Sequence, residues 1–301
     1  MAAAPHEDAL TVPAYDEAGE SVARRATLWE LARRHPTSAV GGLLLIIMIL
    51  VAIVAPYLGT VDPLALNPVR RLRPPSAEMW FGTDTVGRDL YSRVLYGARV
   101  SLLVGFSVAF LSTAIGLAVG LISGFNRLLD GIVMRVMDGL MAIPPILLAI
   151  ALMALTRASI QNVVIAITIA EVPRVSRLVR SVVLTLREQP FIEAAYATGT
   201  RSWRILTLHI LPNTVAPLMV QATYVCASAI IIEAVLSFLG AGTPPDIPSW
   251  GNIVAEGRNL FLVAPYIIII PGLFLSVTAL AVNLLGDGPR DALDPRLARK
   301  L

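Results

Sequence analysis

Long apolar runs separated by short polar stretches make up most of the chain. Six such runs cover residues 40–58, 100–125, 132–155, 160–184, 215–239 and 261–285. A helix needs roughly 20 apolar residues to cross a bilayer, and most of these runs reach that length. Backbone groups inside lipid must be paired within the protein, which favours helices. The pattern therefore predicts an all-α membrane protein with six transmembrane helices.

The run at 160–184 is the weakest of the six, because Glu171, Pro173 and Arg174 interrupt it. The basic residues favour counting it as a span. With six spans, 16 of the 24 Lys and Arg residues lie on the side of the two termini and eight on the other, and cytoplasmic segments carry the excess of positive charge. Both termini are therefore predicted to be cytoplasmic, and the polar fourth helix is predicted to face other helices rather than lipid.

One membrane domain between two tails is the predicted organisation. Residues 1–37 are polar and are interpreted as a cytoplasmic N-terminal tail rather than a secretory signal, because no small-residue cleavage site follows the first apolar run. Residues 38–286 form the predicted six-helix domain, and residues 287–301 form a cytoplasmic C-terminal tail. No internal repeat of 20–50 residues is present, so a single helical bundle is expected.

Two segments on the predicted external side carry structural signals. Within residues 82–99, apolar residues recur at helical spacing and Asp89 stands four positions before Arg93, as in an ion-paired helix. This pattern predicts an amphipathic helix on the membrane face, which either covers the bundle or binds a partner. Between the fifth and sixth runs, turn-forming Gly and Pro precede Trp250, a predicted interfacial anchor. This loop either closes the connection or contacts a receptor.

Composition agrees with a membrane protein and excludes several other classes. The chain is 56% hydrophobic and 15% charged, with a mean hydropathy of +0.72, far from soluble averages. The net charge of +3 is small, and arginines clustered between apolar runs suit lipid headgroups better than nucleic acid. Cys226 is the only cysteine and the three histidines lie far apart, so no metal site is expected within the chain.

Sequence motifs of catalysis are also missing. No phosphate-binding loop of the Walker type occurs, and GLAVGLISG at residues 116–124 is interpreted as small-residue helix packing. No arrangement of Ser, His and an acid suggests a nucleophilic triad, and no HExxH motif or pair of intramembrane aspartates suggests a protease. The chain is therefore predicted not to be an enzyme, with no catalytic residues and no ATP hydrolysis of its own.

Polar residues within the predicted spans are few, and an ionisable residue inside a membrane is a functional candidate. The candidates for a translocation pathway are Asn162, Glu171, Ser228 and Glu233. Glu233 is the best placed, near the external end of the fifth helix, although a helix-end or hydrogen-bonding role fits it as well. A proton or sodium carrier usually has a denser relay of carboxylates, which weakens that alternative.

The stretch EAAYATGTRSWRILTLHILPN, residues 193–213, is too polar for lipid. Residues 193–197 favour a helix, Gly199 interrupts it, and residues 203–210 favour a second short helix before Pro212. Glycine at the bend permits a positive φ and the close approach of a partner. Arg201 and Arg204 are predicted to face an acidic or polar cleft. The apolar side chains expected to hold the segment to the bundle are Ile205, Leu206, Leu208 and Leu211.

This stretch closely resembles the cytoplasmic loop of importer-type ABC permeases, through Glu193-Ala194-Ala195, then Gly199, then Ile210-Leu211-Pro212. The resemblance continues in FGTDTVGRDLYSRVLYGARVSL before the second helix, IPPILLAI in the third, VLSFLGAG and PSWG after the fifth, and NLLGDGPRDALDP near the C-terminus. It covers about residues 30–296. The chain is similar to the second permease subunit of dipeptide, oligopeptide or nickel ABC importers.

The resemblance implies the MetI-like permease fold of type I ABC importers and a set of partners. Residues 187–212 would be the coupling loop that docks on an ATPase subunit. The residues assigned to this coupling are Glu193, Ala194, Ala195, Gly199, Arg201, Leu211 and Pro212. Partners would be a homologous second permease, two ATPase subunits that bind ATP and Mg²⁺, and an extracytoplasmic solute-binding protein. The chain itself would bind no cofactor, and its location would be the bacterial cytoplasmic membrane.

Two functional hypotheses follow. The first is a permease subunit for ATP-driven import of di- or oligopeptides, in which ATP binding draws the coupling loops together. Nickel or another solute is the alternative cargo, and the scarcity of His and Cys in the spans favours peptides. The second hypothesis is an ion-coupled carrier or channel working alone. The two differ in whether the cytoplasmic loop needs an ATPase.

Overall fold

The computed structural model describes residues 36–293, and within this range the chain is helical and has no β-strand. Its long helices are α2 (Pro36–Val54), α3 (Leu90–Phe125), α6 (Ile160–Arg187), α9 (Leu211–Phe238) and α11 (Tyr266–Leu293). Its shorter α-helices are α4 (Arg127–Met141), α5 (Pro145–Ala154), α7 (Pro190–Ala197), α8 (Ser202–Arg204) and α10 (Trp250–Gly257). Single 3₁₀ turns cover Ala55–Tyr57, Pro68–Arg70 and Arg258–Leu260, and a π-helical stretch covers Ile205–Ile210.

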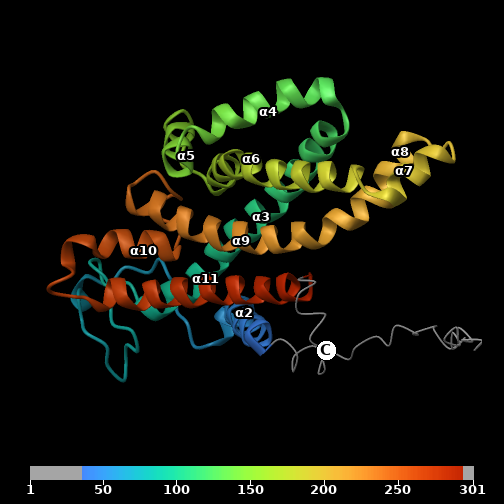
Figure 1. Cartoon of the computed structure of the whole chain (residues 1–301). Coiled ribbons are helices and arrows are strands. Elements are labelled where there is room, and N and C mark those ends of the chain that lie inside the picture. The colour runs from blue at the N-terminus through green and yellow to red at the C-terminus, as the bar shows by residue number, and fades with distance from the viewer. Residues whose placement is uncertain (1–35, 294–301) are drawn as a thin grey trace, which may run out of the picture.

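The long helices form one bundle (Figure 1). α6, α9 and α11 lie side by side, α3 crosses them and packs mainly on α6 and α9, and α2 packs on α11. α7 and α8 project at one end of the bundle, whereas α10 and the segment that links α2 to α3 lie at the opposite end. The projecting segment and the predicted external segments thus lie at opposite ends of the bundle.

Close contact between α3 and α6 depends on a stripe of small residues. A methyl group built on Gly116 would lie 2.6 Å from Cβ of Val175, and one built on Gly120 would lie 2.6 Å from Cβ of Val179. Such distances are too short for real carbon atoms, so only glycine permits the observed approach of the two helices. The interpretation of residues 116–124 as a helix-packing motif is confirmed.

Within residues 36–293, four helical stretches are long and apolar enough to cross a membrane: Pro36–Tyr57, Leu90–Phe125, Ser202–Phe238 and Tyr266–Gly288. The bent pair α4 and α5 supplies a fifth if it counts as one span. α6 has 28 residues, but its charged side chains make it less apolar. Six spans therefore remain a prediction. Most of the predicted tails, residues 1–37 and 287–301, lies outside the described residues.

The third apolar run does not form the single helix that was predicted for residues 132–155. It is divided between α4 and α5, whose axes meet at 88°. Pro144 and Pro145 lie at the break. Each proline lacks a backbone N–H, and each disfavours helical geometry in the residue before it, so the helix ends and restarts in a new direction.

The prediction of a separate amphipathic helix over residues 82–99 is wrong. Residues 82–89 form a turn closed by an isolated antiparallel bridge between Thr83 and Asp89, and α3 begins at Leu90 and continues for 36 residues to Phe125. Leu90 and Val94 are completely buried, so the periodic apolar face packs inside the bundle instead of on lipid. Asp89 is not the ion partner of Arg93. Its carboxylate caps α3 by accepting a hydrogen bond from the backbone N–H of Ser92 at 2.8 Å.

Trp250 is likewise not an interfacial anchor. Its side chain is completely buried, and its indole Nε1 donates a hydrogen bond of 3.0 Å to the carbonyl oxygen of Val94. Gly97 lies next to it, because a methyl group there would be 3.4 Å from the indole ring. A large aromatic ring with its one polar group satisfied therefore fixes the start of α10 against α3.

Candidate functional site

The projecting segment, residues 187–212, turns sharply at Gly199. φ of Gly199 is +78°, which confirms the predicted use of glycine at the bend. The N–H of Gly199 donates to the carbonyl of Tyr196, and the N–H of Thr200 donates to the carbonyl of Ala195, both at 3.0 Å. This pair of hydrogen bonds is a Schellman motif, which satisfies the last carbonyls of α7 and lets the chain reverse direction.

The second short helix that was predicted before Pro212 is not a separate element. α8 continues through the π-helical stretch directly into α9, so the segment from Ser202 to Phe238 is one apolar helix. Pro212 has no N–H to donate, and it falls where the backbone hydrogen bonds change from the wider π pattern to the α pattern. The helix therefore passes through the proline without a break.

A few buried side chains attach the segment to the bundle. Ile192, Ile205 and Ile210 are completely buried, which confirms Ile205 as an anchor. Leu208 is 65% exposed and does not anchor the segment. Ile192 and Ile210 were not among the predicted anchors, although both belong to the apolar periodicity of this region.

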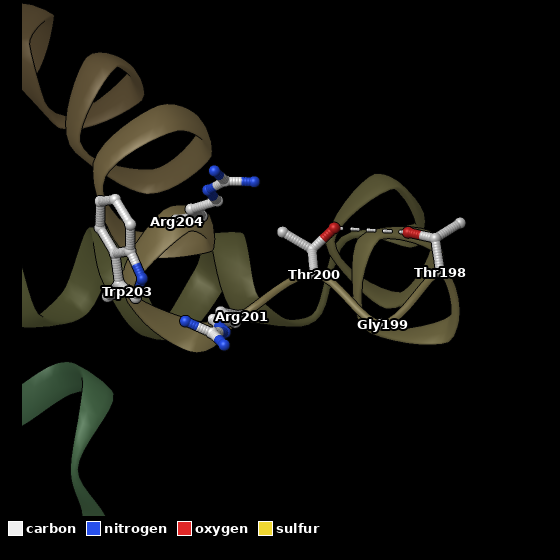
Figure 2. Close-up of a pocket in the computed structure, with 6 residues that line it drawn as sticks. All are labelled: Thr198, Gly199, Thr200, Arg201, Trp203 and Arg204. Carbon is white, nitrogen blue, oxygen red and sulfur yellow. Dashed lines mark hydrogen bonds between the residues drawn. The ribbon is translucent and has the colours of Figure 1, made fainter.

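The free face of the segment is polar and aromatic (Figure 2). Glu193, Ala194, Gly199 and Arg201 are exposed, and Ala195 is half-buried. An open hollow of about 370 Å³ is lined by Thr198, Gly199, Thr200, Arg201, Trp203 and Arg204. Exposed aromatic rings flank these residues, namely Phe191, Tyr196 and Trp203. Sequence analysis did not use these rings, although aromatics within a polar stretch are typical of interface anchors.

Leu211 and Pro212 lie at the base of the segment rather than on its tip. Leu211 is half-buried and Pro212 is exposed, and both belong to the first turn of α9. The predicted coupling residues therefore form two groups. Those from Glu193 to Arg201 share the projecting tip, and the Leu-Pro pair lies where the tip joins the bundle.

A second polar cluster lies between the middle of α6 and α9. Glu171, which is 1% exposed, accepts a hydrogen bond of 3.3 Å from the hydroxyl of Ser228. Its other carboxylate oxygen lies 3.3 Å from Nη1 of Arg174. The guanidinium of Arg174 stacks over the ring of Tyr224, 5.2 Å from the ring centre. Two predicted pathway residues, Glu171 and Ser228, are thus brought together by the fold, and Arg174 and Tyr224 join them.

Glu233 and Asn162 do not belong to this cluster. Glu233 is completely buried, and its Oε1 accepts hydrogen bonds from Ser237 and Ser249, both at 2.9 Å. These bonds tie the end of α9 to the start of α10, which matches the hydrogen-bonding alternative for this residue. The Asn162 amide donates to the carbonyl of Arg157 at 2.8 Å, near the start of α6.

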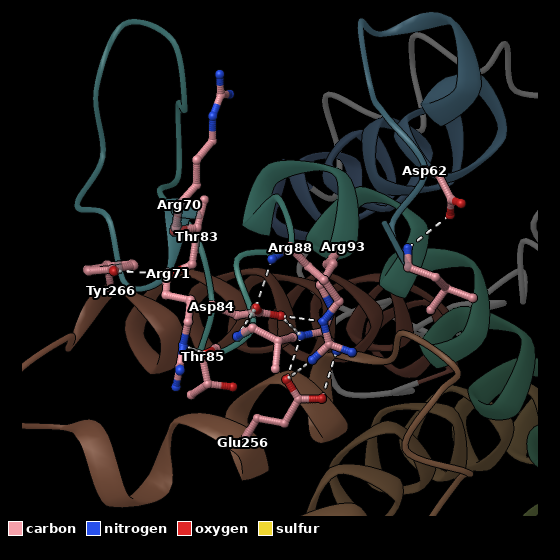
Figure 3. A network of polar contacts seen from close by, with 12 residues as sticks. Asp62, Arg70, Arg71, Thr83, Asp84, Thr85, Arg88, Arg93, Glu256 and Tyr266 are labelled. Atoms are coloured by element: carbon pink, nitrogen blue, oxygen red, sulfur yellow. Dashed lines mark hydrogen bonds and ion pairs between the residues drawn. The ribbon is translucent and has the colours of Figure 1, made fainter. Parts of the chain in front are cut away.

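A buried ion network joins α3 to α10 at the other end of the bundle (Figure 3). Arg93 lies 2.6 Å from Asp84 and 2.5 Å from Glu256. Arg88 contacts the same two carboxylates at 2.6 and 2.7 Å. This network was not predicted, because Glu256 lies more than 160 positions away from both arginines.

Residues 36–293 contain no group of three or more His, Cys, Asp or Glu side chains that could bind a metal ion. Cys226 is a buried free thiol. The features that stand out are therefore a projecting tip at one end of the bundle, a polar cluster in its middle and an ion network at the other end.

Comparisons with known proteins explain this combination of features. Residues 114–299 match the family described as binding-protein-dependent transport system inner membrane component. The chain belongs to this family. It is a permease subunit of an ABC importer, and in such transporters ATP is hydrolysed on separate subunits, so this permease is not itself an enzyme. Residues 26–75 also match the N-terminal transmembrane domain of oligopeptide transport permease C.

Several relatives are similar over nearly the whole permease. A probable peptide ABC transporter permease of Sinorhizobium fredii is 54% identical and covers 91% of this chain and 94% of its own. The dipeptide transport system permease DppC of Alkalihalophilus pseudofirmus is 44% identical over 88% of both chains. A probable D,D-dipeptide permease, DdpC, of Escherichia coli is 40% identical over 91% of this chain and 92% of its own.

The fold of the permease is also known from a solved structure. A chain from "Inward facing conformations of the MetNI methionine ABC transporter" has a TM-score of 0.55 and 22% sequence identity. The match covers 65% of this permease and 93% of that chain. The MetI-like fold that the sequence resemblance implied is therefore confirmed.

Proposed function

We propose that this permease imports di- or oligopeptides as one half of a heterodimeric pathway. The observation that carries this proposal is that the three relatives described above are named for peptide or dipeptide transport, at 40–54% identity. Its partners are a homologous second permease, an extracytoplasmic solute-binding protein and two ATPase subunits that hold ATP and Mg²⁺. The complex lies in the bacterial cytoplasmic membrane, with six spans in this chain and both termini in the cytoplasm.

The projecting tip is proposed as the docking site for an ATPase subunit. It extends beyond the bundle, its bend is fixed by the Schellman motif at Gly199, and Glu193, Ala194 and Arg201 are free to contact a partner. Ala195 is half-buried and offers less surface to a partner. Small residues on one face allow a partner's backbone to approach closely, while the exposed aromatic rings supply apolar contact area.

Leu211 and Pro212 contribute to coupling in a different way. They are the first two residues of α9, directly after the π-helical stretch, so a displacement of the tip is transmitted to the bundle through them. The tip is also the covalent connection between α6 and α9, which carry Glu171 and Ser228 respectively. Movement of the docked tip therefore acts directly on the two helices of the central polar cluster, as a rigid-body mechanism of alternating access requires.

The face that carries Glu171 and Ser228 is proposed to line the pathway. Charged groups in the middle of a spanning helix are costly against lipid and are tolerated where they face protein or a water-filled cavity. Asn162, near the predicted external end of α6, is proposed to lie towards the mouth of the pathway. Glu233 is the least suited of the four, because its hydrogen bonds to Ser237 and Ser249 already hold α9 and α10 together.

Reconstitution of the full complex in liposomes tests the proposal. With ATP inside and loaded binding protein outside, labelled dipeptide should accumulate, and omission of ATP or of the binding protein should reduce uptake to background. Dipeptide uptake by this chain alone, driven by a proton or sodium gradient, would instead support the ion-coupled carrier. Uptake of Ni²⁺ in place of peptide would move the assignment to the alternative cargo.

A further inference from the structure

Arg174 lies near the centre of α6. It is 14 residues after Ile160 and 13 residues before Arg187, the first and last residues of the helix. At 1.5 Å per residue, the guanidinium side chain starts about 20 Å from either end. If α6 crosses the membrane, this position is close to the middle of a hydrocarbon core about 30 Å thick. A charge at this depth is a functional candidate.

In the Arg174–Glu171 ion pair, the arginine is partly exposed and the glutamate is buried. Glu171 is 1% exposed, whereas the side chain of Arg174 is 36% exposed. Tyr224, whose ring supports the guanidinium, is 49% exposed. A molecule moving along this face therefore meets a positive group and an aromatic ring, with the neutralising carboxylate behind them.

Arg174 keeps more of its hydrogen-bonding capacity free than other paired arginines of this chain. A guanidinium has five N–H donors in a planar fork. Arg180 uses two of its nitrogens on the carboxylate of Asp130, at 2.5 and 2.6 Å, and Arg93 likewise grips Glu256 with two nitrogens. By contrast, the guanidinium of Arg174 donates no hydrogen bond to any residue that the structure describes. Its buried Nη1 has only the ion contact with Glu171.

The forces that hold Arg174 are an ion contact of 3.3 Å and the face of an aromatic ring. Neither force occupies the guanidinium fork with a bidentate hydrogen-bonded partner. That fork matches the geometry of a carboxylate, which it binds with two parallel charge-assisted hydrogen bonds. A peptide carries such a carboxylate at its free C-terminus, whereas a divalent cation would be repelled by the exposed positive charge.

We propose that Arg174 determines substrate specificity by binding the free carboxylate of the substrate during its passage. Glu171 and Tyr224 are positioning residues, which hold the guanidinium at the surface of the pathway. This inference rests on the proposed import of peptides, and it adds a chemical requirement. The preferred cargo carries a carboxylate that remains accessible inside the pathway.

The test compares a dipeptide with a free C-terminus and the same dipeptide as its C-terminal amide. The complete complex is reconstituted with wild-type permease, Arg174→Lys or Arg174→Gln, and each peptide is supplied at a concentration that saturates the binding protein. Wild type should prefer the free acid, and Arg174→Gln should lower free-acid uptake by at least about tenfold while affecting the amide little. Arg174→Lys keeps the charge and should retain part of the preference.

Arg177→Gln is the matched control, because Arg177 lies one turn along α6 and pairs with Asp138 at 2.6 Å. It should leave the preference for the free acid unchanged. Equal losses for acid and amide in Arg174→Gln, or loss of the partner permease from the purified complex, would overturn the inference and show a structural role. If wild type takes up neither peptide in the presence of ATP, the proposed import of peptides itself fails.

Discussion

The guanidinium of Arg93 donates two hydrogen bonds to the carboxylate of Glu256, with N–O distances of 2.5 and 2.8 Å. Asp84 lies 2.6 Å from the same guanidinium and is completely buried. Residues 82–89 and the adjoining start of α3 are therefore tied to the distant α10 by one buried cation. This network fixes the end of the bundle opposite to the projecting tip.

Asp84→Asn should destabilise the permease more than Glu256→Gln. Loss of one partner from a buried ion pair leaves an uncompensated charge and costs about 3–5 kcal/mol. Asp84 is the fully buried partner and also accepts backbone hydrogen bonds from Val86 and Arg88, whereas Glu256 is partly exposed. Thermal stability of the purified permease in detergent is the measurement. Equal melting temperatures for both variants and wild type would contradict the assigned role.

Gly120→Ala should separate α3 from α6. The added methyl group would lie 2.6 Å from Cβ of Val179 and 2.7 Å from the carbonyl oxygen of Ser176, and neither group can yield without a shift of the helix. We expect a lower yield of folded protein and a melting temperature several degrees lower. Gly131→Ala is the control, because that helical glycine has open space around it and alanine is the better helix former. A Gly120→Ala protein as stable as the control would exclude the packing argument.

Topology is tested by reporter fusions. Fusions at residue 30 and after Arg296 should report the cytoplasm, and a fusion at the exposed Ser76, in the segment between α2 and α3, should report the external side. The reason is the excess of Lys and Arg on the side of the termini. An external C-terminus would remove α6 or the α4–α5 pair from the set of spans and would place the tip on the wrong side for an ATPase.

The sequence was sufficient for features that depend on local physics. Apolar length identified the long helices, the glycine stripe identified the α3–α6 contact, and Gly199 identified the bend. Features that depend on distant partners were not accessible. Helical periodicity in residues 82–99 could not distinguish a helix on the membrane surface from the buried beginning of α3. For Trp250, the local sequence is the same whether the ring lies at the lipid interface or in the core.

The central site was predictable only in part, for the same reason. Glu171 and Ser228 were recognised as unusual within apolar runs, but their contact joins positions 57 residues apart. Arg174 was treated as an interruption of the fourth run, because sequence alone does not reveal that its counter-ion is buried behind it. Pro144-Pro145 is a local signal for the break between α4 and α5. A single helix was nevertheless predicted for residues 132–155, because the run is apolar and long enough to span a membrane.

ATP-driven uptake by Gly199→Val tests the coupling role of the tip most directly. Valine at φ +78° is strained by about 1–2 kcal/mol or more. Apart from its two chain neighbours, no described residue lies within 4 Å of the added Cβ, so the bundle should assemble with its partner permease. Gly59→Val is the matched control, since Gly59, in the segment that links α2 to α3, has φ +70° and equally open surroundings. We expect peptide uptake near background and weak ATPase association for Gly199→Val, a milder loss for Gly199→Ala, and near-normal uptake for Gly59→Val. Normal uptake by Gly199→Val at wild-type protein levels would contradict the docking of an ATPase on this tip.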